Sequence, residues 1–377
     1  MEFVSRRLPP RKEEEALGSI CESWDWTEIA KTFASEGSGA LSIASISSGR
    51  HQTAEGLARA SLAGQLPPLQ VLCFHIDSFQ ASRTEEHMGL NSESQPVEAP
   101  SNLQVHCAAD LPERTFHAGL LSLVTTGEAE LTRDYLQQLF QRLAIGGHLF
   151  VSVDNLEDKW VHDQLKSLEK SVKVRRHELG LVYVIQKTRE LKKLKDFTCE
   201  LAYRDCDELI RMVTRPGVFS HRQLDNGARQ LLDTVDVYPQ SRLLDIGCGP
   251  GSVALGLAKR DPSAHVHAVD ASARAIDCVN RGIQLNELSN ITTEVNWTGI
   301  YGEEATYDMA LANPPYYGDF RIAEKFLNAA HRSLRSGGRL VLVTKQPSWY
   351  QANLERWFQD CEVFESRRYF IASGIKG

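Results

Sequence analysis

Short apolar runs alternate with helical patterns over the first part of the chain. Between residues 1 and 157, Leu41–Ile46, Val71–Ile76 and His148–Val153 are predicted strands, and Arg133–Leu143 is a predicted helix. Strands that alternate with helices favour βαβ units and a parallel sheet. The polar stretch between Ser78 and Asn102 predicts a loop. The pattern therefore predicts an α/β fold.

The same alternation returns after residue 200, where the predicted strands are Leu243–Ile246, His265–Val269, Met309–Ala312 and Arg339–Val343. A length of 377 residues suggests two domains. We expect one domain over residues 1–157 and another over 200–377. Residues 158–199 are expected to form a basic connecting segment that includes the end of the first domain.

Three stretches of the second domain resemble stretches of the first in the same order. Residues 243–260 match 43–60, residues 306–315 match 115–124, and residues 334–343 match 143–152. These matches indicate a duplicated domain. The alternative is that two α/β domains look alike because the fold demands it.

Composition places the chain among ordinary globular proteins, with 42% hydrophobic and 24% charged residues and a net charge of −7. Its apolar runs are too short to span a bilayer, and the N-terminal residues lack the apolar core of a signal peptide. The eight cysteines include no CxxC pair, so no metal site is expected. Reduced thiols in a cytoplasmic protein are the simplest interpretation.

Although the net charge of the whole chain is negative, one segment is strongly basic. Residues 159–195 hold eleven lysines and arginines against four acids, and Thr188–Lys195 predicts a basic helical face. If this segment faces RNA, its cations can contact phosphates. The candidate contacts are Lys187, Arg189, Lys192, Lys193 and Lys195. The alternative is a solvated helix face that offsets acidic neighbours.

A glycine-rich turn follows the predicted strand that ends at Ile246. It contains Gly247, Gly249 and Gly251, and Asp245 stands just before it. The glycines permit a tight turn and a close approach of a ligand to the backbone. A carboxylate at this place would repel a pyrophosphate. The pattern therefore favours a cofactor that carries an ammonium group.

A second acid, Asp270, ends the next predicted strand, where it can accept hydrogen bonds from both hydroxyls of a ribose. Asp245, the glycine turn and Asp270 together resemble the class I S-adenosylmethionine-dependent methyltransferases. The resemblance implies that S-adenosylmethionine is the cofactor.

The strand after that ends in Asn313, Pro314, Pro315 and Tyr316. Two prolines hold the backbone rigid, so the Pro314 carbonyl and the Asn313 side-chain carbonyl form a fixed pair of acceptors for an NH₂ group. Tyr316 can stack on a planar substrate. This tetrapeptide resembles the [D/N]PP[Y/F] motif of amino-group N-methyltransferases, which implies Asn313, Pro314 and Tyr316 as catalytic residues.

Upstream, Pro216–Ser220 and Leu224–Gly227 read PGVFS and LDNG. With the motifs above, they resemble the bacterial ribosomal RNA small-subunit guanine-N2 methyltransferases. That resemblance implies two tandem Rossmann-like class I methyltransferase domains, with seven-stranded, mostly parallel sheets and helices on both faces. It also implies that Phe219, Ala271, Asn296, Trp297 and Asn313 join Asp245, Asp270 and the three glycines around the cofactor.

In this family, a degenerate domain precedes the catalytic one. By the internal comparison, Ser45, Ser47 and His51 replace Asp245, Gly247 and Gly251, and residues 122–124 replace Asn313–Pro315. Asp77 is the candidate counterpart of Asp270. We therefore expect the first domain to be inactive and to serve in RNA recruitment or in folding support.

The leading hypothesis is methyl transfer to the N2 amine of a guanine in 16S ribosomal RNA, naked or within the small subunit. One alternative is a protein glutamine-N5 methyltransferase, whose motif is similar. Another is a non-catalytic RNA-binding factor for ribosome assembly.

Overall fold

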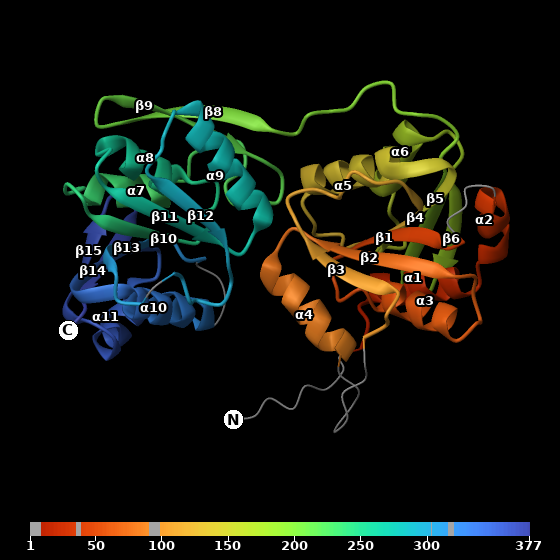
Figure 1. The fold of residues 1–377 in the computed structure, drawn as a ribbon, viewed down its shortest axis with the longest axis horizontal. Coiled ribbons are helices and arrows are strands. Elements are labelled where there is room, and N and C mark those ends of the chain that lie inside the picture. Colours follow the sequence, from red (N-terminus) through yellow and green to blue (C-terminus); the bar gives the residue numbers. More distant parts are fainter. Residues whose placement is uncertain (1–8, 35–38, 90–98, 303, 316–319) are drawn as a thin grey trace. The chain divides into compact units, whose positions relative to one another are not determined.

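The computed structural model describes residues 9–34, 39–89, 99–302, 304–315 and 320–377. The chain forms two compact units, Met1–Phe197 and Thr198–Gly377, and each has its own seven-stranded sheet (Figure 1). The predicted α/β fold with two tandem domains is confirmed.

The first unit begins with two helices and then alternates strands with helices. Its elements are α1 (Lys12–Glu22), α2 (Trp26–Phe33), β1 (Leu41–Ser47), α3 (Gln52–Leu62), β2 (Leu69–His75), α4 (Ser78–Gly89), β3 (Leu103–Cys107), β4 (Phe116–Leu123), α5 (Ala129–Arg142), β5 (Leu143–Val153), α6 (Trp160–Leu168), β6 (Lys173–His177) and β7 (Gly180–Gln186).

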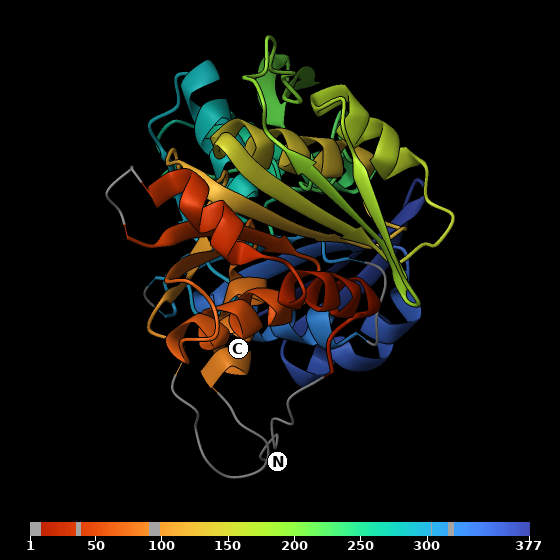
Figure 2. The ribbon, with the colours of Figure 1, turned by 90° about the vertical axis from the view of Figure 1, so that its right-hand side faces the viewer.

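Both faces of the first sheet are covered. The strand order is β3-β2-β1-β4-β5-β7-β6, and β7 is antiparallel to both of its neighbours, β5 and β6, whereas the other pairs are parallel. Neighbouring residues of β1 point to opposite faces: Ile43 packs with α1, α2 and α3, whereas Ala44 packs with α5 and α6. Figure 2 shows the red N-terminal helices on one side of this sheet and the yellow-green α6 on the other.

The second unit starts with a β-hairpin and then repeats the same alternation. Its elements are β8 (Cys199–Asp205), β9 (Glu208–Thr214), α7 (Asn226–Thr234), β10 (Arg242–Ile246), α8 (Ser252–Arg260), β11 (His265–Asp270), α9 (Ala273–Leu285), β12 (Ile291–Val295), β13 (Tyr307–Ala312), α10 (Arg321–Ser333), β14 (Leu334–Thr344), α11 (Pro347–Asn353), the 3₁₀ turn Leu354–Arg356, β15 (Gln359–Ser366) and β16 (Tyr369–Ile375).

The second sheet repeats the topology of the first. Its order is β12-β11-β10-β13-β14-β16-β15, and β16 is antiparallel to both of its neighbours, β14 and β15, whereas the other pairs are parallel. Leu243 packs with α7 and α8 on one face, and Leu244 packs with α10 on the other. The hairpin is fixed to this core by Arg260, whose Nε and Nη2 bond both oxygens of the buried Asp205 at 2.7 and 2.8 Å. Helices on both faces of seven-stranded, mostly parallel sheets are thereby confirmed.

Two predicted local structures are wrong. Ser78–Gly89 is helix α4 rather than loop, because Ala81, Thr84 and Met88 form a buried stripe at helical spacing among polar residues. Thr188–Lys195 contains no helix. Much of the stretch 158–199 builds α6, β6 and β7, and so completes the first unit.

Within the described residues, no helix combines the length and the apolar character needed to cross a membrane. All eight cysteines are described, and their thiols are unpaired.

Candidate active site

Three polar residues singled out by the sequence meet at the carboxyl edge of the second sheet. β10 lies between β11 and β13, so the chain leaves β10 toward one neighbour and later returns on its other side. Asp245, Asp270 and Asn313 lie at or just beyond the ends of these three strands. In open α/β sheets, ligands bind in the crevice at such a switch point.

The glycine turn between β10 and α8 requires glycine for conformation and for space. Gly247, Gly249 and Gly251 have φ values of 70°, 53° and 84°. A Cβ on Gly251 would lie 2.9 Å from Val279 Cγ2 of α9, and a Cβ on Gly247 would lie 2.9 Å from the Phe326 ring of α10. The turn is therefore tight, as predicted from its sequence, and two of its glycines also pack closely against α9 and α10; we call it the glycine cradle.

Asp245 is a buried carboxylate under this cradle. Its Oδ2 accepts a hydrogen bond of 3.1 Å from the backbone N–H of Ala254 in the first turn of α8. Burial raises the pKa of Asp245 to about 7 and nearby Asp270 adds to the rise, although the Ala254 N–H opposes it. A cation beside Asp245 would favour its ionised form. The residue therefore fits the ammonium group of S-adenosylmethionine.

Asp270 joins the glycine turn to the start of α9. Its Oδ2 accepts from the Gly249 N–H at 2.9 Å, and its Oδ1 accepts from the Ser272 N–H at 2.8 Å. These bonds fix the carboxylate at the end of β11, where a nucleoside ribose would need an acceptor. Ala271 follows and is partly exposed.

Asn313 is oriented by a residue far away in the sequence. Its Nδ2 donates to Asp225 Oδ2 at 2.7 Å, and the same oxygen accepts from the Ala228 N–H at 2.9 Å at the start of α7. Because the amide nitrogen faces Asp225, the acceptor Oδ1 is at the opposite end of the amide. Pro314 is buried, which holds its carbonyl in place, and Tyr316 lies outside the described residues.

The PGVFS segment is held against α9. Arg274, which is fully buried, donates to the Pro216 carbonyl at 3.0 Å, and Arg215 pairs with Asp277 at 2.9 Å. Phe219 projects from this anchored segment and is 58% exposed. An exposed aromatic ring on a fixed backbone is available to cover a ligand.

The loop after β12 carries Asn296 and Trp297. The Asn296 backbone N–H donates to the Asp270 carbonyl at 2.9 Å, which brings the loop to the same edge of the sheet. Its side-chain Nδ2 bonds Glu294 and the Ile300 carbonyl, and its Oδ1 accepts from Thr298. The Asn296 side chain thus shapes its own loop, while the Trp297 ring lies 5.8 Å from Lys325 Nζ of α10.

Two features of the site were missed from the sequence. Asp225 belongs to the LDNG stretch, but its bond to Asn313 spans 88 residues and leaves no local signal. Phe320, which caps α10 with φ of 56°, stacks on Trp349 of α11 with ring centroids 4.7 Å apart. Only aromatic composition near the tetrapeptide hinted at this pair.

The equivalent place in the first unit holds a different polar cluster. Ser45, Ser47 and His51 replace the Asp245 and glycine positions, and a carboxylate arrives instead from α1. Glu14 Oε2 accepts from the Thr53 N–H at 3.1 Å at the start of α3, and its Oε1 accepts from the hydroxyls of Ser47 and Ser122. The chain's own Glu14 therefore occupies the edge where a cofactor would need room.

Asp77 is not the counterpart of Asp270, and that expectation is wrong. β1 pairs Ile46 with Phe74 as β10 pairs Ile246 with Val269, so His75 takes the place of Asp270. Burial lowers the pKa of His75 to about 2, so its ring is neutral. Asp77 caps α4 through the Gln80 N–H at 2.9 Å. A mostly apolar cavity of about 360 Å³ remains at this edge.

Lys187 is wrong as an RNA contact. Its side chain is 1% exposed, and its Nζ donates to the carbonyls of Gln141 and Leu143 at 3.0 and 2.8 Å at the end of α5. It acts as a helix cap. The remaining candidates are exposed in an irregular segment: Arg189, Lys192, Lys193 and Lys195.

Comparison with known proteins agrees with this geometry. The pattern of the methyltransferase small domain family matches residues 209–373. Ribosomal RNA small subunit methyltransferase C of Pseudomonas entomophila (strain L48) is 28% identical over 280 residues, which cover 72% of this chain and 83% of that protein. Ribosomal RNA large subunit methyltransferase G of Magnetococcus marinus (strain ATCC BAA-1437 / JCM 17883 / MC-1) is 30% identical over 46% of this chain and 48% of its own length.

Among solved structures, the T. thermophilus 16S rRNA N2 G1207 methyltransferase (RsmC), in complex with AdoMet and guanosine, superposes with a TM-score of 0.72. It shares 19% identity, and the match covers 97% of this chain and 92% of that one. The likeness establishes the shared two-unit fold. Residues 209–373 of the second unit thus match the methyltransferase small domain, and the chain as a whole shares its two-unit fold with that structure.

Proposed function

We propose that this protein transfers a methyl group from S-adenosylmethionine to the N2 amine of a guanine in 16S ribosomal RNA. The observation that carries the proposal is the Asn313 amide, whose nitrogen is bonded to Asp225 so that its carbonyl end is the acceptor. It lies at the same sheet edge as the buried Asp245 and the fixed Asp270. This arrangement can bind a primary amine of the substrate and the ammonium group of the cofactor at the same edge of the sheet.

One set of residues would bind the cofactor, and the tetrapeptide would bind the base. Asp245 and the glycine cradle would hold the amino-acid end of the cofactor, and Asp270 the ribose. Phe219, Ala271, Asn296 and Trp297 would surround the adenine. The bound cofactor supplies an activated methyl group on a positively charged sulfur.

The tetrapeptide Asn313–Tyr316 would orient the substrate amine for attack on the methyl group. Asn313 Oδ1 and the Pro314 carbonyl would accept its two hydrogens, which directs the nitrogen lone pair out of the base plane. Tyr316 would stack on the guanine. Catalysis then rests mainly on positioning, and the proton that the amine loses passes to water.

The RNA partner is proposed to contact the first unit as well. Arg189, Lys192, Lys193 and Lys195 are exposed and follow β7, where they can meet phosphates. Removing them should weaken RNA binding and flatten its salt dependence. Because ribosomal RNA is the substrate, we place the activity in the cytoplasm.

The test is methyl transfer from labelled S-adenosylmethionine to small-subunit RNA that lacks the modification, both naked and in assembled 30S subunits. We expect N2-methylguanine at one position with the wild-type chain and none with Asn313→Ala. Large-subunit RNA and a release factor serve as competing substrates. Label in the release factor alone would support glutamine-N5 transfer, and absence of cofactor binding in calorimetry would support a non-catalytic assembly factor.

A further inference from the structure

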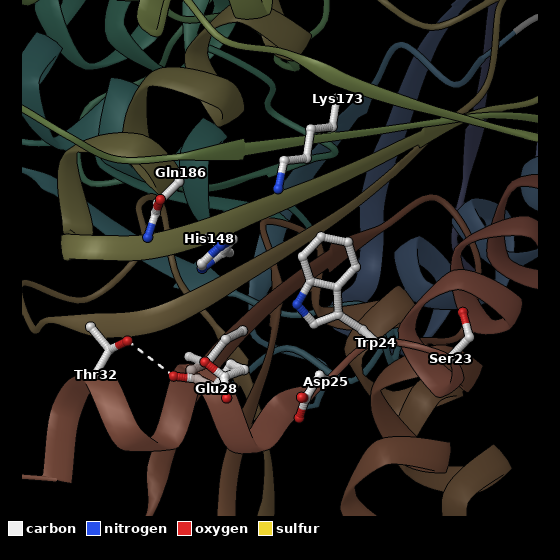
Figure 3. A pocket seen from close by; sticks show the side chains of 9 residues that line it. Ser23, Trp24, Asp25, Glu28, Thr32, His148, Lys173 and Gln186 are labelled. Carbon is white, nitrogen blue, oxygen red and sulfur yellow. Dashed lines mark hydrogen bonds between the residues drawn. The ribbon is translucent and has the colours of Figure 1, made fainter.

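The first unit has a second cavity, of about 440 Å³, that takes no part in the sites described above. It lies between α2 and the strands β5, β6 and β7, and its walls differ in chemistry (Figure 3). One wall carries Asp25 and Glu28, the other carries His148, Lys173 and Gln186, and Trp24 stands between the two.

Trp24 is held by contacts with two other rings. Its ring meets Phe150 at a centroid distance of 5.0 Å and an angle of 89°, and it meets His148 at 5.9 Å and 63°. Lys173 Nζ lies 5.8 Å from the Trp24 ring centroid. The ring is only partly buried and lines the cavity, so its orientation is fixed before a ligand arrives. A fixed indole is a stacking surface for an unpaired base.

The acidic wall offers two carboxylates as acceptors. Asp25 caps α2 by accepting from the Thr27 N–H at 3.0 Å and from the Thr27 hydroxyl, and these bonds lower its pKa, chiefly the one from the hydroxyl. Glu28 is exposed on the same helix, where its Oε1 accepts from Lys31 Nζ at 2.7 Å. Two carboxylates beside an aromatic ring select a base that presents amine hydrogens, as in cytosine or guanine, over one that presents carbonyl oxygens, as in uracil.

The opposite wall is suited to a phosphate and a sugar. Lys173 and Arg175 are exposed on the edge strand β6 and pair with Val184 and Val182, which belong to the same apolar cluster as α2. His148 Nδ1 is buried and has no hydrogen-bond partner within the described residues. Burial, and then Lys173, lower the pKa of His148, so its ring is neutral. Two cations on this face of the edge strand disfavour a cationic peptide and favour an anionic backbone.

We propose that this cavity binds one unpaired, amine-bearing nucleotide of the RNA substrate, with the base on Trp24, its amine toward Asp25 and Glu28, and its phosphate at Lys173. The inference rests on the proposed function, because it assigns the first unit a direct part in holding the same RNA. It places base recognition in a domain that has lost the cofactor cradle.

The binding experiment uses the full chain and fluorescein-labelled RNA pentamers of cytidine or uridine, read by anisotropy. We expect the wild type to bind the cytidine pentamer several-fold more tightly. The double variant Asp25→Asn/Glu28→Gln, which keeps shape and the helix cap, should bring the ratio of the two affinities to about one. Lys173→Ala should lower the slope of log affinity against log salt by about 0.7 for both pentamers.

Matched controls separate recognition from folding. Lys166→Ala removes an exposed lysine from α6 of the same unit and should leave the cytidine preference unchanged. Trp24→Ala should weaken cytidine binding roughly tenfold, and Trp24→Phe should restore most of it, because a ring is retained. Thermal unfolding and cofactor affinity report whether each variant is intact.

Activity distinguishes failure of this inference from failure of the proposed function. The cavity variants should raise KM for ribosomal RNA several-fold and leave kcat and the cofactor Kd unchanged. If the wild type methylates the RNA and all cavity variants match it in KM and base preference, the cavity is not a nucleotide site. If the wild type methylates no RNA, the proposed function itself is wrong.

Discussion

Asn313 Nδ2 and Asp225 Oδ2 are 2.7 Å apart, and the same Asp225 oxygen caps helix α7. One carboxylate therefore fixes both the start of a helix and the direction of the amide that would meet the substrate amine. An amide can present either end to a neighbour, and a carboxylate accepts hydrogen bonds only. Asp225 thus acts as a positioning residue for Asn313.

Asp225 is expected to contribute both to turnover and to stability. We expect Asp225→Ala to lower kcat about 10- to 100-fold through loss of amide orientation, and to cost about 1 kcal/mol of stability through loss of the helix cap. Asp225→Asn keeps an oxygen for both donors and should recover most of the activity. Kinetics and thermal unfolding of both variants would show this, and equal kcat values for the two would contradict it.

Asn313 itself is expected to serve turnover rather than cofactor binding. Asn313→Ala should lower kcat at least 100-fold, because a fixed acceptor for the amine is lost. The cofactor Kd, measured by calorimetry, should change less than threefold. A parallel loss of cofactor affinity would mean that Asn313 serves the cofactor instead.

Cofactor affinity should depend on pH through Asp245. Its pKa is raised to about 7 by burial and by Asp270, so below pH 7 it is increasingly protonated and cannot pair with an ammonium group. We expect the affinity to fall about tenfold per pH unit below pH 7 and to level off above it. Calorimetry in buffers of different ionisation enthalpy would detect the proton released on binding.

The same shift gives the cofactor-free protein an opposite trend. Asp245 ionises near pH 4 in the unfolded chain and near pH 7 in the folded one, so between these values the unfolded state binds fewer protons. Its contribution to stability therefore falls as pH rises from about 4 to 7. Asp245→Asn should abolish both pH trends and weaken cofactor binding, and a trend that survives in this variant would assign it to another group.

Gly249 and Gly251 of the cradle both have positive φ values but differ in how closely neighbouring side chains pack against them. Gly251→Ala meets Val279 at 2.9 Å and needs φ of 84°, whereas Gly249→Ala has nothing within 4 Å and needs φ of 53°. Both carry the strain of a positive φ, about 1 kcal/mol, and only Gly251→Ala adds a clash. We expect a larger loss of thermal stability and of cofactor affinity for Gly251→Ala, and equal losses would show that packing against α9 is unimportant.

The first unit should depend on Glu14 for folding and not for chemistry. Glu14→Ala leaves the Thr53 N–H and the hydroxyls of Ser47 and Ser122 without this acceptor, which should cost about 1–3 kcal/mol. We expect a lower Tm with an unchanged cofactor Kd. Exposed Glu15 on the same helix supplies the control, since Glu15→Ala should change neither quantity. A new cofactor site in Glu14→Ala would contradict a purely structural role.

Local backbone chemistry determined much of this protein from its sequence. The residue type alone indicates the backbone conformation at two places. Three glycines adopt positive φ values in the turn after β10, and two consecutive prolines follow β13. Apolar runs likewise marked β1, β10, β11 and β13. The order of these motifs was therefore enough to predict the fold, the cradle and the tetrapeptide, and to predict the loss of both in the first unit.

Only the tertiary structure decided which distant groups meet. Three contacts join elements that are far apart in the chain. Asp225 bonds Asn313, Glu14 reaches the edge of the first sheet that corresponds to the cofactor edge of the second, and Lys187 is buried against the end of α5. The polar α4 is a helix because packing buries one narrow stripe of it. Such contacts depend on how strands and helices stack in space, and hydrogen bonds across that distance leave no periodicity in the sequence.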